Sequence, residues 1–227
     1  MATVFFKRKY PSVVAVATAL LFSVSVGLYA VFLNGLQYYP LVKSFYFLVD
    51  NSTHIDACVA TSTLQGGAGY IVDDGTREYS AMSVYLTKGA GEVAQSGLVD
   101  ERSYSLIEKR VDGLYFKTVS QKRRKARVLS AFRCLDACIQ VLNGEIQRLE
   151  DNATQRSTKR VLTDLAKQFI FLAQEYQRDF SNYAVLCDKV GETLNALTQG
   201  IVYARDLRYL CCSVCDGFVQ LSNEFAL

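Results

Sequence analysis

Hydrophobic residues are spread unevenly along this 227-residue chain, and the longest apolar stretch lies near its beginning. No charged residue occurs between Lys9 and Lys43, and the segment from Val13 to Leu33 is almost wholly apolar. A helix of about 20 residues, rising about 1.5 Å per residue, matches a hydrocarbon core of about 30 Å. The pattern predicts a transmembrane helix over residues 13–33, preceded by a short segment over residues 1–12.

The charges beside this stretch predict its orientation. Lys7, Arg8 and Lys9 precede it, whereas only Lys43 follows closely. Because basic residues favour the cytoplasmic side, we expect a single-pass protein of the cell membrane with a cytoplasmic N-terminus and an extracytoplasmic remainder. The alternative is a cleaved signal peptide, which usually has an apolar core of about 7 to 15 residues and a small-x-small site. The longer run and the absence of Ala-x-Ala after Leu33 favour an uncleaved anchor.

Residues 34–113 show short alternating runs separated by glycines and turn residues. Aromatic and β-branched runs predict strands, Asp-Gly between apolar runs predicts a hairpin, and a serine or threonine before a helical period predicts a helix start. The expected strands are 45–49, 70–72, 78–86 and 104–108, with helices over about 53–65 and 89–98. This β-α-β-β-α-β order predicts a split βαβ domain, in which two helices cover one face of a four-stranded antiparallel sheet.

Strand alternation assigns side chains to the two faces of that sheet. Residues expected to face the helices are Phe45, Phe47, Val49, Met82, Val84 and Leu86. Residues expected on the open face are Tyr46, Leu48, Ala81, Ser83 and Tyr85. Tyrosines on an open sheet face could stack on sugar rings. The alternative is that this apolar face packs on the helical region or on another chain.

Beyond Gly113 glycines become few and apolar positions alternate by three and four, as in helices that pack through a seam. Helices are expected over about 119–151, 162–176, 186–201 and 207–221, forming a hairpin or a three- or four-helix bundle. The change in composition predicts a boundary between a sheet domain, residues 34–113, and a helical domain, residues 114–227. The predicted fold class is therefore α+β, with a transmembrane helix, a split βαβ domain and a helical bundle.

Three segments resemble the SPOR domain, the sporulation-related repeat of bacterial envelope proteins. They are Phe-Tyr-Phe-Leu-Val at 45–49, Gly-Gly-Ala-Gly-Tyr at 66–70 and Tyr-Ser-Ala-Met-Ser-Val-Tyr at 79–85. The resemblance covers about a third of the chain and leaves the helical region unrecognised. It implies binding of peptidoglycan glycan strands on the open sheet face, in cell division or sporulation. The chain departs from that family at Leu48, where a glutamine is usual, and at Asp50 and Tyr85, where glycines are usual.

Charge and cysteine content limit the kinds of partner and of binding site that the sequence predicts. Three of the 25 basic residues precede residue 10, so the remainder is balanced against 22 acidic residues and lacks the basic surface that nucleic acid requires. The seven cysteines cannot all pair within one chain, so we expect free thiols or an intermolecular bridge. Cys134, Cys138 and Cys187 fall in apolar helical stripes, where cysteine acts as a small hydrophobe. The cluster Cys211, Cys212 and Cys215 lacks a second pair, and the only histidine is His54, so no metal or cofactor is predicted.

No spacing of nucleophile, base and acid typical of an enzyme is present, so we expect a non-catalytic protein. The basic run Lys122, Arg123, Arg124, Lys125 and Arg127 is either a solvated helix start or a contact to anionic lipids or wall polymers. Two functions follow as hypotheses. The first is a membrane-anchored protein that binds peptidoglycan glycan. The second is a membrane-tethered scaffold whose sheet face and helices bind another envelope protein or a second copy.

Overall fold

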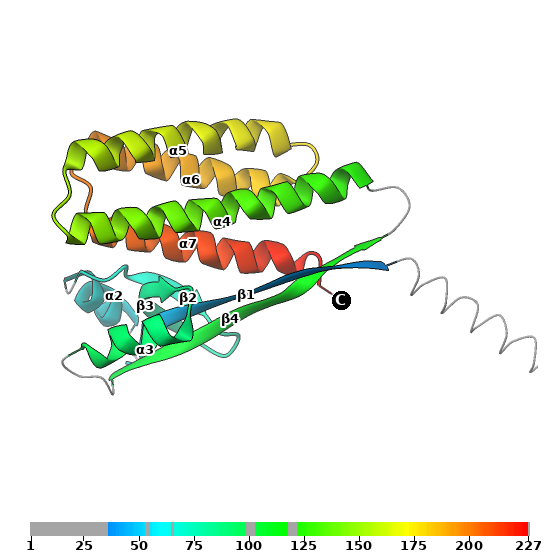
Figure 1. The fold of residues 1–227 in the computed structure, drawn as a ribbon. Helices are drawn as coiled ribbons and strands as arrows, with labels where there is room; N and C mark the ends of the chain where they lie inside the picture. Colours follow the sequence, from blue (N-terminus) through cyan, green and yellow to red (C-terminus); the bar gives the residue numbers. More distant parts are fainter. Residues whose placement is uncertain (1–35, 53–54, 65, 99–102, 118–121, 227) are drawn as a thin grey trace, which may run out of the picture.

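The computed structural model describes residues 36–52, 55–64, 66–98, 103–117 and 122–226. A four-stranded sheet with two short helices precedes four long helices in the chain (Figure 1). The strands are β1 (Leu36–Asp50), β2 (Tyr70–Asp73), β3 (Glu78–Tyr85) and β4 (Tyr104–Lys117). The helices are α2 (Ile55–Leu64), α3 (Lys88–Ser96), α4 (Lys122–Glu150), α5 (Gln155–Tyr176), α6 (Ser181–Gln199) and α7 (Ala204–Asn223).

The sheet has the strand order β2-β3-β1-β4, and each neighbouring pair is antiparallel. This is the order of a split βαβ unit. Strands β1 and β4 are much longer than predicted, because they pair from Leu36 opposite Lys117 to Asp50 opposite Tyr104. They form a two-stranded ribbon that extends beyond the other two strands (Figure 1).

A bulge allows this ribbon to pass through two residues that usually interrupt strands. Tyr39 lies opposite Leu114 and Val42 opposite Asp112, so Pro40 and Leu41 together face only Gly113. Such a bulge accommodates a proline because the extra residue is not required to donate in the ladder. Gly113 has φ +137°, and the ring of Tyr38 lies where a side chain at this position would be.

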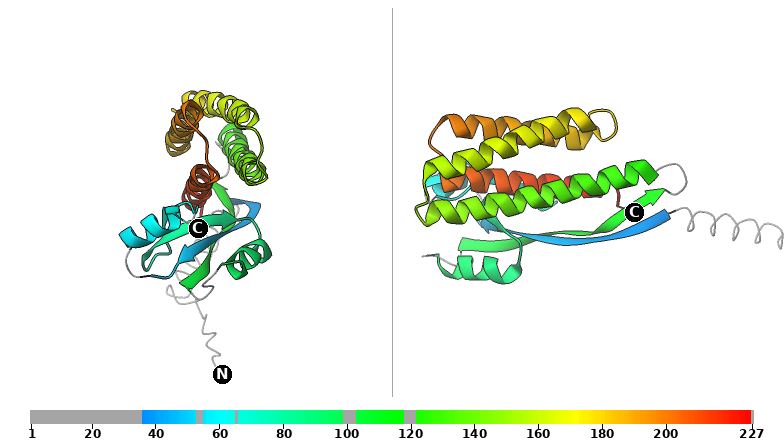
Figure 2. Two further views of the ribbon diagram at one scale, coloured as in Figure 1. Left: turned by 90° about the vertical axis from the view of Figure 1, so that its left-hand side faces the viewer. Right: turned by 45° about the horizontal axis from the view of Figure 1, so that its top comes forward.

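The four long helices form a bundle in which α5 lies against α6 and α4 lies against α7. Helix α7 packs directly on the sheet, while α5 and α6 lie farther from it (Figure 2). A hairpin of the first two long helices was one predicted arrangement. Helix α5 does follow α4 after a short turn, but α4 packs mainly on α7 and only slightly on α5. The bundle is therefore completed by α7, which contacts both α4 and α6.

One hydrophobic core extends from the sheet into the bundle. The ring of Phe218 on α7 lies 5.4 Å from Phe45 on β1 and 4.9 Å from Phe132 on α4, measured between centroids. Both contacts have the edge-to-face geometry that aromatic pairs prefer. Sheet, α4 and α7 consequently share buried side chains.

The structure corrects the predicted fold class. It is α+β with a four-stranded antiparallel sheet, but none of the described helices is long and apolar enough to cross a membrane. The predicted transmembrane helix over 13–33 and the segment 1–12 lie outside the described residues. The predicted domain boundary after Gly113 falls inside β4, and the shared core links the residues on both sides of it.

Candidate functional site

The five residues predicted for glycan binding occupy both faces of the sheet. Tyr46 pairs with Tyr85 and Leu48 with Ser83, so these four side chains share one face. The register shifts between Leu48 and Val49, which pairs with Ala81. Because of this bulge, Ala81 lies in the core with Val49, on the face that α7 covers.

Helix α3 covers the face that was expected to be open. Leu48 is only 3% exposed and clusters with Met82 and Tyr104, and Ala94 and Leu98 pack against this cluster from above. Helix α3 comes close because Gly91 has no side chain, and a Cβ there would lie 2.8 Å from Leu106. The expectation of an open sheet face with Leu48 and Ala81 accessible is therefore wrong, since one helix or another lies over each of them.

Two of the five residues, Ser83 and Tyr85, reach a groove at the outer edge of β3. Strand β2 pairs with β3 only from Glu78 to Ala81, so the end of β3 extends past its neighbour. The groove has a volume of about 260 Å³, and Ile146 and Gln147 of α4 form its opposite wall. Burial raises the pKa of the Tyr85 phenol.

An ion pair closes one end of the β3 groove. The Arg208 guanidinium of α7 contacts the Glu150 carboxylate at the end of α4. Arg208 also donates to the carbonyl of Gly66, which leads into β2. The groove is thus bounded by the backbone edge of β3, by apolar side chains and by one ion pair. Its two charged lining residues, Arg208 and Glu150, pair with each other.

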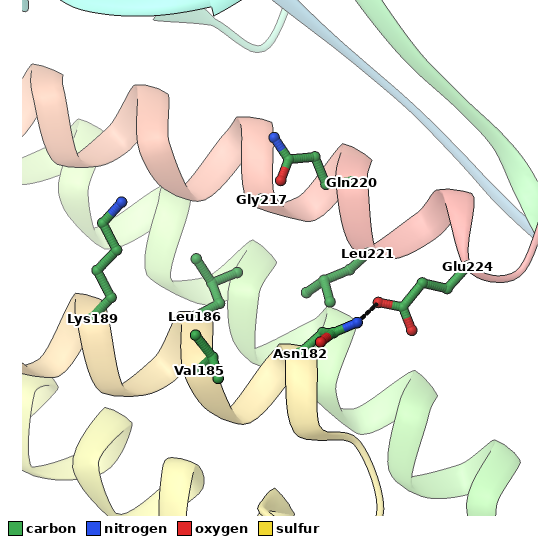
Figure 3. A pocket seen from close by; sticks show the side chains of 8 residues that line it. All are labelled: Asn182, Val185, Leu186, Lys189, Gly217, Gln220, Leu221 and Glu224. Atoms are coloured by element: carbon green, nitrogen blue, oxygen red, sulfur yellow. Dashed lines mark hydrogen bonds between the residues drawn. The ribbon is translucent and has the colours of Figure 1, made fainter.

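A larger groove lies between α6 and α7, with a volume of about 410 Å³ (Figure 3). Val185, Leu186 and Leu221 supply its apolar surface, and Val185 is 68% exposed. Leu186 approaches α7 closely because position 217 is glycine, where a Cβ would lie 2.8 Å from the leucine side chain.

Polar side chains border the α6–α7 groove at both ends. Asn182 donates to Glu224 over 2.8 Å at one end, and Lys189 lies at the other (Figure 3). The separation of seven positions between Asn182 and Lys189 corresponds to about 10 Å, or two helical turns, at about 1.5 Å per residue. Sequence reasoning did not identify this groove. The groove forms where α6 and α7 come together, and the periodic pattern of either helix alone does not show how the two are placed.

A buried polar cluster joins α7 to the sheet beside this groove. Asp216 is 6% exposed, and it accepts from Lys109 of β4 at 2.6 Å, from Tyr70 of β2 at 3.0 Å and from Gln220 at 2.9 Å. Burial, then the nearby Asp216 carboxylate, raises the pKa of Tyr70. These three donors compensate for the burial of the carboxylate, which is tolerated only when it is paired. The cluster fixes α7 on the sheet.

The seven cysteines are all free thiols. Of the three cysteines predicted to act as small hydrophobes, Cys138 and Cys187 lie in the core, which confirms the prediction for these two, whereas Cys134 is only partly buried. Cys211, Cys212 and Cys215 are buried on α7, and burial raises the pKa of the last two. A high pKa keeps a thiol protonated and unreactive. Among the described residues no group of three or more histidine, cysteine or acidic side chains is placed to hold a metal, and His54 lies outside them.

Comparison of the chain with protein-family models, with curated proteins and with solved structures found no match. The resemblance to the SPOR domain stays a prediction from the sequence. The geometry of the two grooves is therefore the basis for a functional proposal.

Proposed function

We propose that the protein is a non-catalytic scaffold that holds a helix of a partner protein in the groove between α6 and α7. The observation that carries this proposal is the exposed side chain of Val185 beside the half-buried Leu186, between polar ends. An amphipathic helix lying in an apolar groove is a common mode of peptide recognition, with contacts at every third or fourth residue.

The charges at the ends of the groove specify the partner further. Lys189 lies at one end and Glu224 at the other, about two helical turns apart. A partner helix with an acidic residue near Lys189 and a basic residue about seven positions away would complement both. Oppositely charged groups at the rim mainly set orientation and the rate of association, while the apolar contacts contribute most of the affinity.

Site-specific photo-crosslinking in the cell tests this proposal. A photoreactive residue replacing Val185 should give one discrete adduct, and the same residue replacing Phe171 of α5, which is 62% exposed outside the groove, should not. Lys189→Glu should remove the adduct at position 185 by reversing the charge that selects the partner. An adduct of twice the chain mass would identify the partner as a second copy. Equal adducts at both positions, or none at position 185, would contradict the proposal.

A second candidate function is glycan binding, as the resemblance to the SPOR domain implies. The observation in its favour is that Ser83 and Tyr85 line the groove at the edge of β3, where a sugar could stack on the phenol ring. Full-length protein should then be retained on isolated cell-wall sacculi, more strongly after an amidase has removed stem peptides. Tyr85→Leu should lower this retention, whereas Tyr209→Leu, at an exposed tyrosine outside the groove, should not.

A further inference from the structure

Strand β3 has a free outer edge along the second half of its length. On this side β2 pairs with β3 only as far as Ala81, and the Ala68 amide donates to the Met82 carbonyl over 2.7 Å. On the inner side the pairing with β1 continues to Tyr85. In the part of the chain that the structure describes, no hydrogen bond joins another segment to the outer backbone edge of residues 83–85. A strand edge of this kind can pair with a further strand.

This free edge lacks the residues that usually protect a sheet from pairing with another chain. Lysines, other charged residues and prolines commonly stand at protected edges. Residues 83–86, at the end of β3, read Ser-Val-Tyr-Leu, which contains none of these and includes two residues that favour strands. Strand β4, at the opposite edge of the sheet, carries Glu108, Lys109 and Arg110 in succession. The two edges differ, and the end of β3 is the one suited to pairing.

The β3 groove places side-chain amides opposite this backbone edge. Asn143 and Gln147 of α4 line the groove with Ile146 between them in sequence, and the two amides are one helical turn apart, about 6 Å along the helix. Within the described residues, Gln147 has no hydrogen-bond partner, and the side chain of Asn143 accepts only from the Cys211 thiol at 3.8 Å. In an extended chain, the backbone groups of one edge recur at every second residue, about 6.8 Å apart. The two amides are therefore spaced to bond the far edge of an extended segment.

The size and charge of the groove select a short, uncharged segment. The volume is about 260 Å³, and residues 83–86 span about 10 Å at about 3.4 Å per residue, which corresponds to three or four residues of a pairing strand. The charged lining residues Arg208 and Glu150 already pair with each other. A second copy that joined through its own sheet edge would bring another strand about 4.8 Å behind the first, where α4 forms the wall. A single extended segment is therefore the occupant that fits.

We propose that an extended, uncharged segment of a partner protein binds in the β3 groove as a further strand of the sheet. One backbone edge of this segment pairs with the outer edge of β3, in line with β2. Its other edge faces the side-chain amides of Asn143 and Gln147. Addition of a strand to a sheet edge is a common mode of peptide recognition, in which main-chain hydrogen bonds supply the affinity. This site is separate from the groove between α6 and α7.

Panning of random heptapeptides displayed on phage against immobilised full-length protein tests this inference. Phage that bind the variant Gln147→Trp are removed first, because an indole at this exposed position of α4 would fill the groove. An enriched peptide is then synthesised with a single N-methyl group at each amide in turn. The affinity should fall roughly tenfold at every second position of the bound segment and less at the positions between, because only alternate amides face β3 and each one lost leaves a backbone group unpaired.

Gln140→Trp is the matched control. Gln140 is exposed two turns earlier on α4 and is not among the residues that line the β3 groove. This variant should bind the peptide as tightly as the unmodified protein, whereas Gln147→Trp should weaken binding at least tenfold, with an unchanged Tm in both. Enrichment of no peptide, an equal loss in both variants or an N-methyl series without alternation would overturn the inference. Enrichment of no peptide, together with retention on amidase-treated sacculi that Gln147→Trp abolishes, would assign the groove to glycan instead.

Discussion

Replacing Asp216 tests whether the buried polar cluster holds α7 on the sheet. Asp216→Ala leaves the Lys109 ammonium, whose side chain is only 17% exposed, without its carboxylate at 2.6 Å. Removing one member of a buried ion pair typically costs about 3–5 kcal/mol. Tyr70 and Gln220 lose their acceptor as well. We expect a loss of about 4 kcal/mol in the free energy of unfolding, or roughly 10 °C in Tm for a protein of this size.

Urea unfolding followed by circular dichroism measures this loss, with Glu92→Ala as the control. Glu92 pairs with Lys88 at 3.4 Å on the exposed surface of α3, where such pairs contribute about 0.5 kcal/mol or less. The double variant Lys109→Met, Asp216→Leu replaces both charges by apolar side chains of similar size. It should cost less than Asp216→Ala alone, because no charge is left buried without a partner.

Two outcomes would refute this reasoning. If Asp216→Ala costs no more than Glu92→Ala, the cluster is hydrated and does not hold α7 in place. If the double variant costs as much as the two single changes together, Lys109 and Asp216 do not interact as the geometry requires.

Three further predictions concern the bulge, the thiols and alkaline pH. Gly113→Ala should destabilise the protein by about 1–3 kcal/mol in urea unfolding, because the φ of +137° and the ring of Tyr38 leave no room for a methyl group. The control is Gly89→Ala in α3, which has open space around it and should be neutral or stabilising. A thiol reagent such as Ellman's should react slowly with the native protein, because the six cysteines other than Cys134 are buried. After denaturation the reagent should react with all seven thiols. Fast reaction of several thiols in the native protein would contradict the packing of α7. Burial raises the pKa of Cys187 to about 12 from an ordinary value of 9.0. The contribution of the protonated thiol to the free energy of unfolding is therefore complete below about pH 9 and is lost between about pH 9 and about pH 12. The urea midpoint should fall over that range, and Cys187→Ala should make this fall with pH less steep.

The order of strands and short helices could be predicted from the sequence because it depends on local signals. The Asp-Gly hairpin lies between β2 and β3, and the glycines after residue 65 precede β2 as expected. The full length of β1 and β4 could not be predicted. Pro40 and Gly113 each indicate an interruption when considered singly, and only their position opposite one another turns both into a bulge.

The faces of the sheet were harder to assign than its strands. Alternation correctly placed Phe45, Phe47 and Val49 in the core, yet the bulge after Leu48 moved Ala81 to the opposite face from the one expected. Which helix covers a face depends on contacts between residues more than a hundred positions apart, such as Phe45 with Phe218. A periodic pattern shows that a helix has an apolar side, but it does not identify the surface that this side will cover.

Phe225 is a structural part of the fold, and its late position in the sequence affects how the protein folds during synthesis. The Phe225 carbonyl accepts from the Tyr115 amide of β4, and the ring of Phe225 lies 5.4 Å from Phe116 and 5.6 Å from Phe180. A ribosome adds residues at about 5–20 per second, so α7 and Phe225 are synthesised roughly 10–35 seconds after β1. Until then the face of the sheet that bears Phe45 lacks its cover of α7. The core of the sheet is therefore completed late in synthesis, and a chain truncated before Phe225 would lack the contacts of this ring with Phe116 and Phe180.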